Sequence, residues 1–146
     1  INKNVKKVLE SEKAIGLFSS KKLKKFKSKI TQHISNLKKL IKNLKKIKKN
    51  ISVYGASGKG QALLQFCKLN NKTIDYAFDK SELKQGCYTP GTNIKILNPI
   101  KIKNVKPDFL LLLSWNLKNE IMKQEKKFIN RGGQFIIPFP NPKIIR

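Results

Sequence analysis

The stretch from residue 51 to residue 60 constrains the fold more than any other part of this 146-residue sequence. A short β-branched and aromatic run, Ile51–Tyr54, stops at a glycine, and a helix-like pattern follows over residues 61–66. This order predicts a strand, a glycine turn and a helix N-terminus, where backbone N–H groups and the helix dipole can meet a phosphate. The pattern therefore indicates a nucleotide or phosphate ligand.

The glycine spacing distinguishes this loop from two familiar phosphate loops. A Walker loop carries Lys and then Ser or Thr after its closing glycine, whereas Gln61 and Ala62 follow Gly60. The dinucleotide fingerprint is G-x-G-x-x-G, and the spacing here is G-x-x-G-x-G. The alternative is that the glycines only permit a tight turn and that the loop lysine is solvated. The candidate ligand contacts are Gly55, Ala56, Ser57, Lys59 and Gly60, with Lys59 as a mobile cation.

Strand and helix patterns alternate from residue 51 onward. The run 109–113, Phe-Leu-Leu-Leu-Leu, is apolar on both faces, as a central parallel strand should be. The alternation predicts an α/β fold, a Rossmann-like and mostly parallel sheet flanked by helices. We expect strands at 51–54, 73–78, 109–113 and 134–137, with a weaker one at 94–97, and helices at 59–69, near 99–103 and at 116–130.

Apolar residues recur at three- and four-residue steps before this domain. From Leu23 to Ile47 they predict a long amphipathic helix over residues 21–49, and a shorter helix is expected over residues 5–15, broken at Gly16. We expect this N-terminal helical segment, residues 1–50, to pack on the core of the Rossmann-like domain, residues 51–146. The heptad-like spacing also permits a coiled coil.

Ligands of such sheets lie beyond the carboxyl ends of the strands. Asp79 follows the second expected strand, about where a Rossmann acid meets ribose hydroxyls, although a turn or N-cap aspartate fits equally well. Trp115 and Asn116 follow the apolar run 109–113 and offer a flat apolar face and an amide. Alternatively, Asn116 caps a helix and Trp115 is a packing residue.

The segment 84–92 is too long and polar to be a minimal turn. Gln85 and Tyr88 within it are candidates to reach across the mouth of the site, and a simple ordered connection is the alternative. Its Pro-Gly pair predicts a tight turn with a positive φ at Gly91.

The net charge of +25, from 33 basic and 8 acidic residues, raises the question of a nucleic-acid partner. Only Arg131 and Arg146 are arginines, although base readout favours arginine, and an AT-rich genome would itself supply many Lys, Asn and Ile codons.

Cys67 and Cys87 form no metal-ligand set with the single His33, so we expect reduced thiols in a cytoplasmic protein, with Cys67 in the core. No apolar run is long enough to span a membrane, so we expect no membrane partner. Because arginines are few, we expect no nucleic-acid partner either.

Several of these segments, in this order, resemble the C-terminal domain of the S-adenosylmethionine-dependent sugar C-methyltransferases, which act on nucleotide-linked keto-deoxysugars. The similarity runs from residue 12 almost to residue 145. The sequence departs from the family pattern at Ser57-Gly58, where members often carry Pro-Ala, and in its lysine-rich surface. The matching segments are Tyr54-Gly55-Ala56, Lys59-Gly60, Asp79, Lys84-Gln85-Gly86, Tyr88, Pro90-Gly91-Thr92, Trp115-Asn116 and the closing Gly-Gly-Gln-Phe-Ile-Ile-Pro of residues 132–138.

The resemblance implies that this domain helps to bind a nucleotide-sugar substrate. In that family the zinc site and the methyltransferase domain, which holds S-adenosylmethionine and the catalytic residues, precede it. Because the sequence begins at Ile1, we expect it to start inside a longer protein, with the catalytic domain of the same polypeptide as its partner. We therefore expect no cofactor and no catalysis in this chain alone, which has one histidine and no recognisable nucleophile and base.

The leading hypothesis is a substrate-binding domain of a sugar methyltransferase. Ser57, Lys59 and the loop amides would hold the diphosphate, while Tyr88, Trp115 and Asn116 would frame the base or sugar. Two alternatives stay open at this point: a dinucleotide-binding oxidoreductase domain of the NAD type, and a basic interaction module that works through its long helix.

Overall fold

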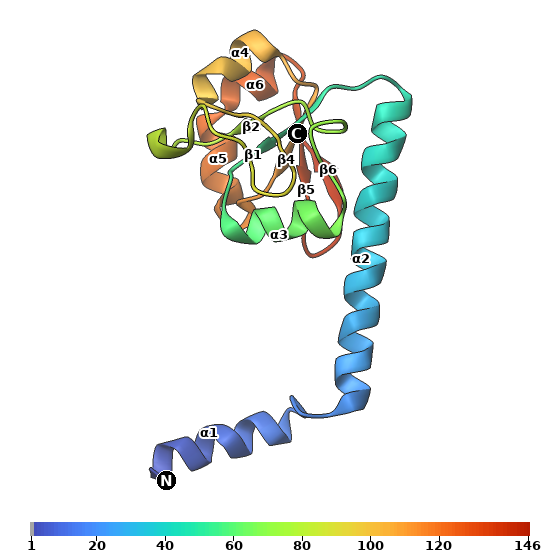
Figure 1. Cartoon of the computed structure of the whole chain (residues 1–146), viewed down its shortest axis with the longest axis vertical. Helices are drawn as coiled ribbons and strands as arrows, with labels where there is room; N and C mark the ends of the chain where they lie inside the picture. The colour runs from blue at the N-terminus through green and yellow to red at the C-terminus, as the bar shows by residue number, and fades with distance from the viewer. Residues whose placement is uncertain (1) are drawn as a thin grey trace. The chain divides into compact units, whose positions relative to one another are not determined.

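The computed structural model describes residues 2–146, which form two compact units, residues 2–34 and 35–146. The first unit holds α1 (Lys3–Ala14) and the beginning of α2 (Ser20–Lys46) (Figure 1). Asn2 caps α1 by accepting a hydrogen bond from the Asn4 amide, and the chain turns at Gly16, whose φ is 69°. Both predicted N-terminal helices are confirmed, with ends shifted by one to three residues.

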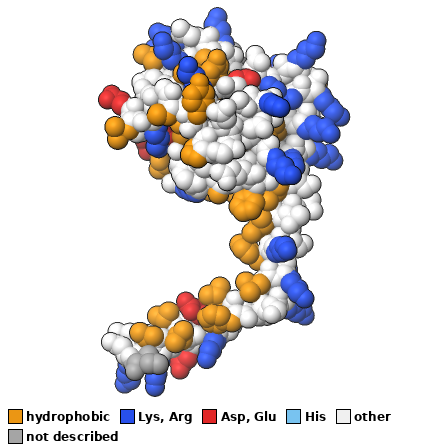
Figure 2. All heavy atoms as spheres, viewed as in Figure 1, with side chains coloured by type: hydrophobic (Ala, Val, Ile, Leu, Met, Phe, Trp, Pro, Cys, Tyr) orange, Lys and Arg blue, Asp and Glu red, His pale blue; other side chains and the backbone are white. Residues whose placement is uncertain are grey.

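The apolar stripe of α2 has two different halves. Leu37, Ile41 and Leu44 belong to the second unit and are buried in its core. Leu23 and Phe26 belong to the first unit and are exposed, Phe26 at 62%. Figure 2 shows hydrophobic side chains on the surface of the N-terminal helices. The compact units thus divide at residue 34. The division into an N-terminal segment, residues 1–50, and a Rossmann-like domain, residues 51–146, stays a prediction. The expected packing of residues 1–34 on the α/β domain stays a prediction.

The second unit is built on a six-stranded sheet of order β3-β2-β1-β4-β5-β6. The first five strands of that order are parallel, and β6 pairs antiparallel with β5. This confirms the predicted α/β fold with a mostly parallel, Rossmann-like sheet. The strands are β1 (Ile51–Tyr54), β2 (Ala77–Phe78), β3 (Ile96–Leu97), β4 (Phe109–Leu112), β5 (Gln134–Ile137) and β6 (Lys143–Ile145).

Helices cover both faces of the sheet. Side chains alternate between faces along a strand, and those of Tyr54, Leu110 and Leu112 share one core cluster with residues of α4, α5 and α6. Their neighbours Val53 and Leu111, which are also fully buried, therefore face the opposite side. The helices of this unit are α3 (Gly58–Phe66), α4 (Ile102–Val105), α5 (Lys118–Gln124) and α6 (Lys126–Asn130), with short 3-10 turns η1 (Glu82–Lys84), η2 (Pro99–Lys101) and η3 (Trp115–Leu117).

Two predicted elements differ most from the observed ones, and one observed strand was not predicted. The helix expected over 116–130 is divided into η3, α5 and α6, because the backbone leaves helical geometry at Glu125 (φ −94°, ψ 31°). The strand expected over 73–78 is reduced to β2, since the Ile74 amide closes a turn onto the Asn70 carbonyl. Strand β6 was not expected.

Candidate functional site

The strand order reverses at β1, which pairs with β2 on one side and with β4 on the other. The chain builds β1, β2 and β3 in one direction and then returns to place β4 beside β1. The carboxyl ends of β1 and β4 therefore flank the crevice where open α/β sheets bind ligands. The loops after these two strands contain most of the predicted site residues.

The glycines after β1 allow the loop to lie close to β4. Gly55 has a φ of 89°, and a Cβ there would collide with the Ser114 hydroxyl. A Cβ on Gly60 would lie 2.6 Å from the Leu113 Cβ, which shows how closely the start of α3 approaches the end of β4. Ser57 is the N-cap of α3, and its hydroxyl accepts a 3.4 Å hydrogen bond from the Gly60 amide. The structure thus has the strand, glycine turn and helix N-terminus that the sequence predicts.

Lys59 connects the β1 loop to the β4 loop. Its Nζ donates a 2.6 Å hydrogen bond to Asn116 Oδ1 and lies 4.8 Å from the centre of the Trp115 ring. Trp115 in turn packs on Phe139, with ring centres 4.6 Å apart. Phe139 follows β5, so three consecutive strands of the sheet contribute to one cluster. Sequence reasoning missed Phe139 as a site residue, although its Pro-Phe-Pro setting directly after a strand was a usable signal.

Asp79, directly after β2, faces the same loop but is fully engaged by the protein. Its carboxylate accepts hydrogen bonds from the Ala56 amide at 2.6 Å and the Ser81 amide at 2.9 Å, and Lys84 Nζ lies 3.3 Å away. Burial raises the pKa of Asp79, but these amides and the Lys84 ammonium outweigh burial and hold the pKa below its usual range. The geometry is that of the turn aspartate, which was the alternative to a ribose contact.

Gln85 and Tyr88 have separate roles. Gln85 Nε2 donates to the Asp79 carbonyl at 3.1 Å, and Gln85 Oε1 accepts from Asn98 at 3.2 Å, so Gln85 fixes the turn after β2. Tyr88 is 55% exposed and forms an isolated antiparallel bridge with Lys95. The predicted positive φ at Gly91 is confirmed at 69°.

A hollow of about 170 Å³ lies beside Gly55 at the switch point, and its carboxylates come from Asp79 and Glu120. Tyr54 forms part of its lining and donates a 3.1 Å hydrogen bond to Glu125 Oε1. Burial and the neighbouring Glu125 carboxylate raise the pKa of Tyr54 far above its usual range. Burial also raises the pKa of Glu125, despite the Tyr54 hydrogen bond and the cations Lys80 and Arg131.

A model of the C-methyltransferase C-terminal domain family matches residues 1–140. The chain belongs to this family. The C-methyltransferase NovU of Streptomyces niveus is 43% identical over 95 residues, which cover 65% of this chain and 23% of that protein. The chain thus matches less than a quarter of the length of this relative. The resemblance stated from the sequence is confirmed at the level of this methyltransferase-associated domain.

Within residues 2–146, no three His, Cys, Asp or Glu side chains are grouped so that they could hold a metal ion. None of the described helices is both long and apolar enough to cross a membrane. Cys67 is buried, as predicted, Cys87 is exposed, and both are free thiols.

The arrangement brings several binding groups together at the crevice. The predicted residues Ser57, Lys59, Trp115 and Asn116 meet at the crevice, and they offer a cation, a hydroxyl, an amide and an aromatic face. Such groups recognise a phosphate and a flat or apolar neighbour.

Proposed function

We propose that this domain binds the nucleotide-linked sugar substrate of an S-adenosylmethionine-dependent C-methyltransferase, at the crevice between β1 and β4. The observation that carries the proposal is the position of Lys59, whose ammonium group lies at the N-terminus of α3 and joins the two loops of the switch point. Family membership makes a methyltransferase the natural context, and the substrate assignment is our own inference.

The diphosphate would lie over the first turn of α3. The amides of Gly58 and Lys59 belong to the part of a helix that has no intrahelical acceptor, and the helix dipole adds positive potential there. The Ser57 hydroxyl accepts from Gly60 and retains its own proton to donate. Lys59 would exchange its Asn116 hydrogen bond for a phosphate oxygen, which is a stronger, charge-assisted acceptor.

The uncharged parts of the substrate would lie on either side of the diphosphate. The stacked rings of Trp115 and Phe139 offer an apolar surface for a base. The Glu120 carboxylate lines the hollow beside Gly55, where it would accept hydrogen bonds from sugar hydroxyls. A ribose contact through Asp79 alone, as in an NAD-type domain, is less well supported because amides and Lys84 already engage that carboxylate.

The methyl donor would then be bound by a catalytic methyltransferase domain of the same polypeptide, and zinc by a separate domain that precedes it. Two free thiols fit a reducing, cytoplasmic location, where such a deoxysugar pathway enzyme would act.

Lys59→Ala tests the proposal. It removes a charge-assisted hydrogen bond worth about 1.5–3 kcal/mol, so the affinity of the 146-residue chain for UDP-glucose and dTDP-glucose should fall about ten- to a hundredfold in calorimetric titrations. S-adenosylmethionine should not bind to either form.

Lys127→Ala is the matched control, because Lys127 is an exposed lysine on α6, which leads into the opposite, amino end of β5. It is a better control than Lys45, which forms an ion pair with Asp75. Equal, small losses for Lys59→Ala and Lys127→Ala would show that Lys59 acts only through general charge attraction.

A further inference from the structure

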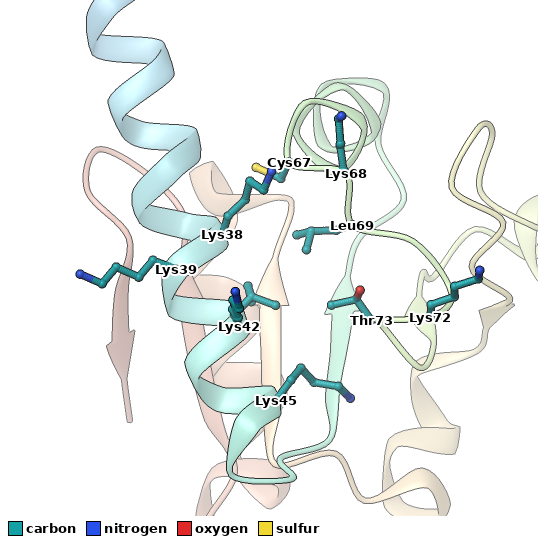
Figure 3. Close-up of a pocket in the computed structure, with 10 residues that line it drawn as sticks. Lys38, Lys39, Lys42, Lys45, Cys67, Lys68, Leu69, Lys72 and Thr73 are labelled. Carbon is teal, nitrogen blue, oxygen red and sulfur yellow. The ribbon is translucent and has the colours of Figure 1, made fainter.

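A second concave site lies at the other end of α3 from the switch point, between α2 and the segment that follows α3 (Figure 3). We call it the lysine groove; its volume is about 550 Å³. Its apolar lining comes from Ile41, Cys67 and Leu69, all of which are buried. Its remaining lining is Thr73 and six lysines, Lys38, Lys39, Lys42, Lys45, Lys68 and Lys72.

The positive charge of the groove is almost unneutralised. Among residues 2–146, Lys45 is the one of the six lysines that forms an ion pair, with Asp75 at 3.6 Å. Like charges gathered around a hollow with an apolar floor repel one another more strongly than the same charges spread over an open surface. A bound anion would relieve this repulsion.

The lysines that reach into the groove come from α2. Lys38, Lys42 and Lys45 follow one another at helical spacing, so they share one face of α2. In Figure 3 the side chain of Lys38 runs toward Cys67 and that of Lys45 toward Thr73, whereas Lys39 points away. Across the groove, Lys68 lies two residues past the end of α3 with a left-handed φ of 53°, a conformation that usually selects glycine. Figure 3 shows the side chains of Lys68 and Lys72 pointing away from α2, so they add positive potential at the rim of the groove.

We propose that the lysine groove binds a small organic polyphosphate, with two or more phosphates against the lysines and the organic part on the apolar floor. The volume falls within the range of about 300–1,000 Å³ usual for small-molecule sites. No arginine and no aromatic residue lines the groove, which argues against base readout or base stacking of a nucleic acid.

The groove is separate from the proposed substrate site. The switch-point loop leads into the first turn of α3, and the groove begins at Cys67, directly after its last turn. A nine-residue helix separates them by roughly 13 Å, at about 1.5 Å per residue. The two sites therefore lie at opposite ends of α3.

Calorimetric titration with ADP and with pyrophosphate, at about 0.1 M salt to limit non-specific attraction, tests the proposal. In Lys38→Ala/Lys42→Ala, ADP affinity should fall about tenfold or more, because two charged contacts are lost. Lys72→Gln, at the rim across from α2, should give a smaller loss because this side chain points away from α2. The surface control Lys103→Ala/Lys127→Ala should leave ADP affinity unchanged, since both lysines are exposed on other helices.

Amide chemical shifts locate the bound ADP. We expect changes at residues 38–45 and 67–73, which persist in Lys59→Ala, and ADP should bind more tightly than pyrophosphate because its organic part covers the apolar floor. The site would be overturned if the groove variants and the control variant lost ADP affinity equally. It would also be overturned if the amide shift changes were confined to residues 55–60 and 114–116. If pyrophosphate binds as tightly as ADP, the apolar floor has no role in binding. If polyglutamate or single-stranded RNA binds and ADP does not, the proposed ligand class is wrong.

Discussion

Gly58 and Gly60 stand two positions apart in α3, yet an alanine should have opposite effects at the two positions. Nothing lies within 4 Å of a Cβ placed on Gly58, so Gly58→Ala should raise the free energy of unfolding by about 0.5–1 kcal/mol through lower backbone entropy in the unfolded chain. A Cβ on Gly60 meets the Leu113 Cβ at 2.6 Å, so Gly60→Ala should lower it by about 1–3 kcal/mol. Urea denaturation measures both, and changes of the same sign would contradict the packing of α3 on β4.

The carboxyl groups of Asp79 and Glu125 have pKa values shifted in opposite directions, which gives a second prediction. Burial raises the pKa of Glu125, so its stabilising contribution is complete below the unfolded value and is lost as the pH rises through the folded pKa. Glu125→Gln keeps an acceptor for Tyr54 and should therefore be more stable than the wild type at pH 7, with the gain shrinking toward pH 4. Asp79, whose pKa is lowered, behaves oppositely and loses its contribution only as the pH falls through its folded pKa.

Thermal unfolding across pH 4–8 checks this prediction. Glu82→Gln is the control, because Glu82 is exposed on η1. A Glu125→Gln variant that is less stable than the wild type at pH 7, or a gain that does not depend on pH, would show that burial does not disfavour the ionised Glu125.

At the scale of elements, the sequence predicted best those strands whose signal is continuous apolar character. The expected starts and ends of β1 and β5 are exact, and β4 ends one residue early, because each is a run of buried residues beside a breaker. Strand β6 was not predicted, because it begins with Lys143 directly after a proline and is hydrogen-bonded to the sheet only through antiparallel pairing with β5. Pairing of this kind depends on the finished sheet.

The candidate site, like the strands, was predictable only in part. The meeting of Lys59 with Trp115 and Asn116 follows from strand order, since the carboxyl ends of β1 and β4 adjoin. The engagement of Asp79 by the Ala56 amide does not, because it depends on side-chain direction across two loops. The sequence thus predicts which loops adjoin, but it does not predict the hydrogen-bond partners of the side chains in those loops.

Helix ends supply a prediction at this scale. The last turn of α2 closes with hydrogen bonds from the Lys48 amide to the Lys45 carbonyl and from the Lys49 amide to the Leu44 carbonyl, the Schellman pattern, with Lys48 at a φ of 56°. Lys48→Gly should therefore raise the free energy of unfolding by about 0.5–1 kcal/mol. Lys46→Gly, within the same helix, should lower it by a similar amount. Loss of stability in both variants would contradict the left-handed turn.

The charge of the whole molecule is the feature that no single element explains. The sequence has 33 basic residues against 8 acidic ones, and among residues 2–146 three carboxylates form ion pairs with lysine, those of Asp75, Asp79 and Asp108. Most of the lysines therefore repel one another across the folded surface, and the compact state bears more of this repulsion than the expanded unfolded chain.

Salt should accordingly stabilise this protein. Raising NaCl from about 10 mM to about 100 mM shortens the screening length from about 30 Å to about 10 Å, so repulsion between distant lysines largely disappears. We expect the midpoint of thermal unfolding to rise by several degrees, since about 1 kcal/mol corresponds to roughly 4 °C for a chain of this size. Lys103→Ala/Lys127→Ala, which removes two exposed charges, should unfold at a higher temperature than the wild type at low salt and should gain less from added NaCl. A midpoint that is flat or falls with NaCl would mean that the lysines are held in compensating ion pairs, and that the net charge of +25 does not weaken the fold.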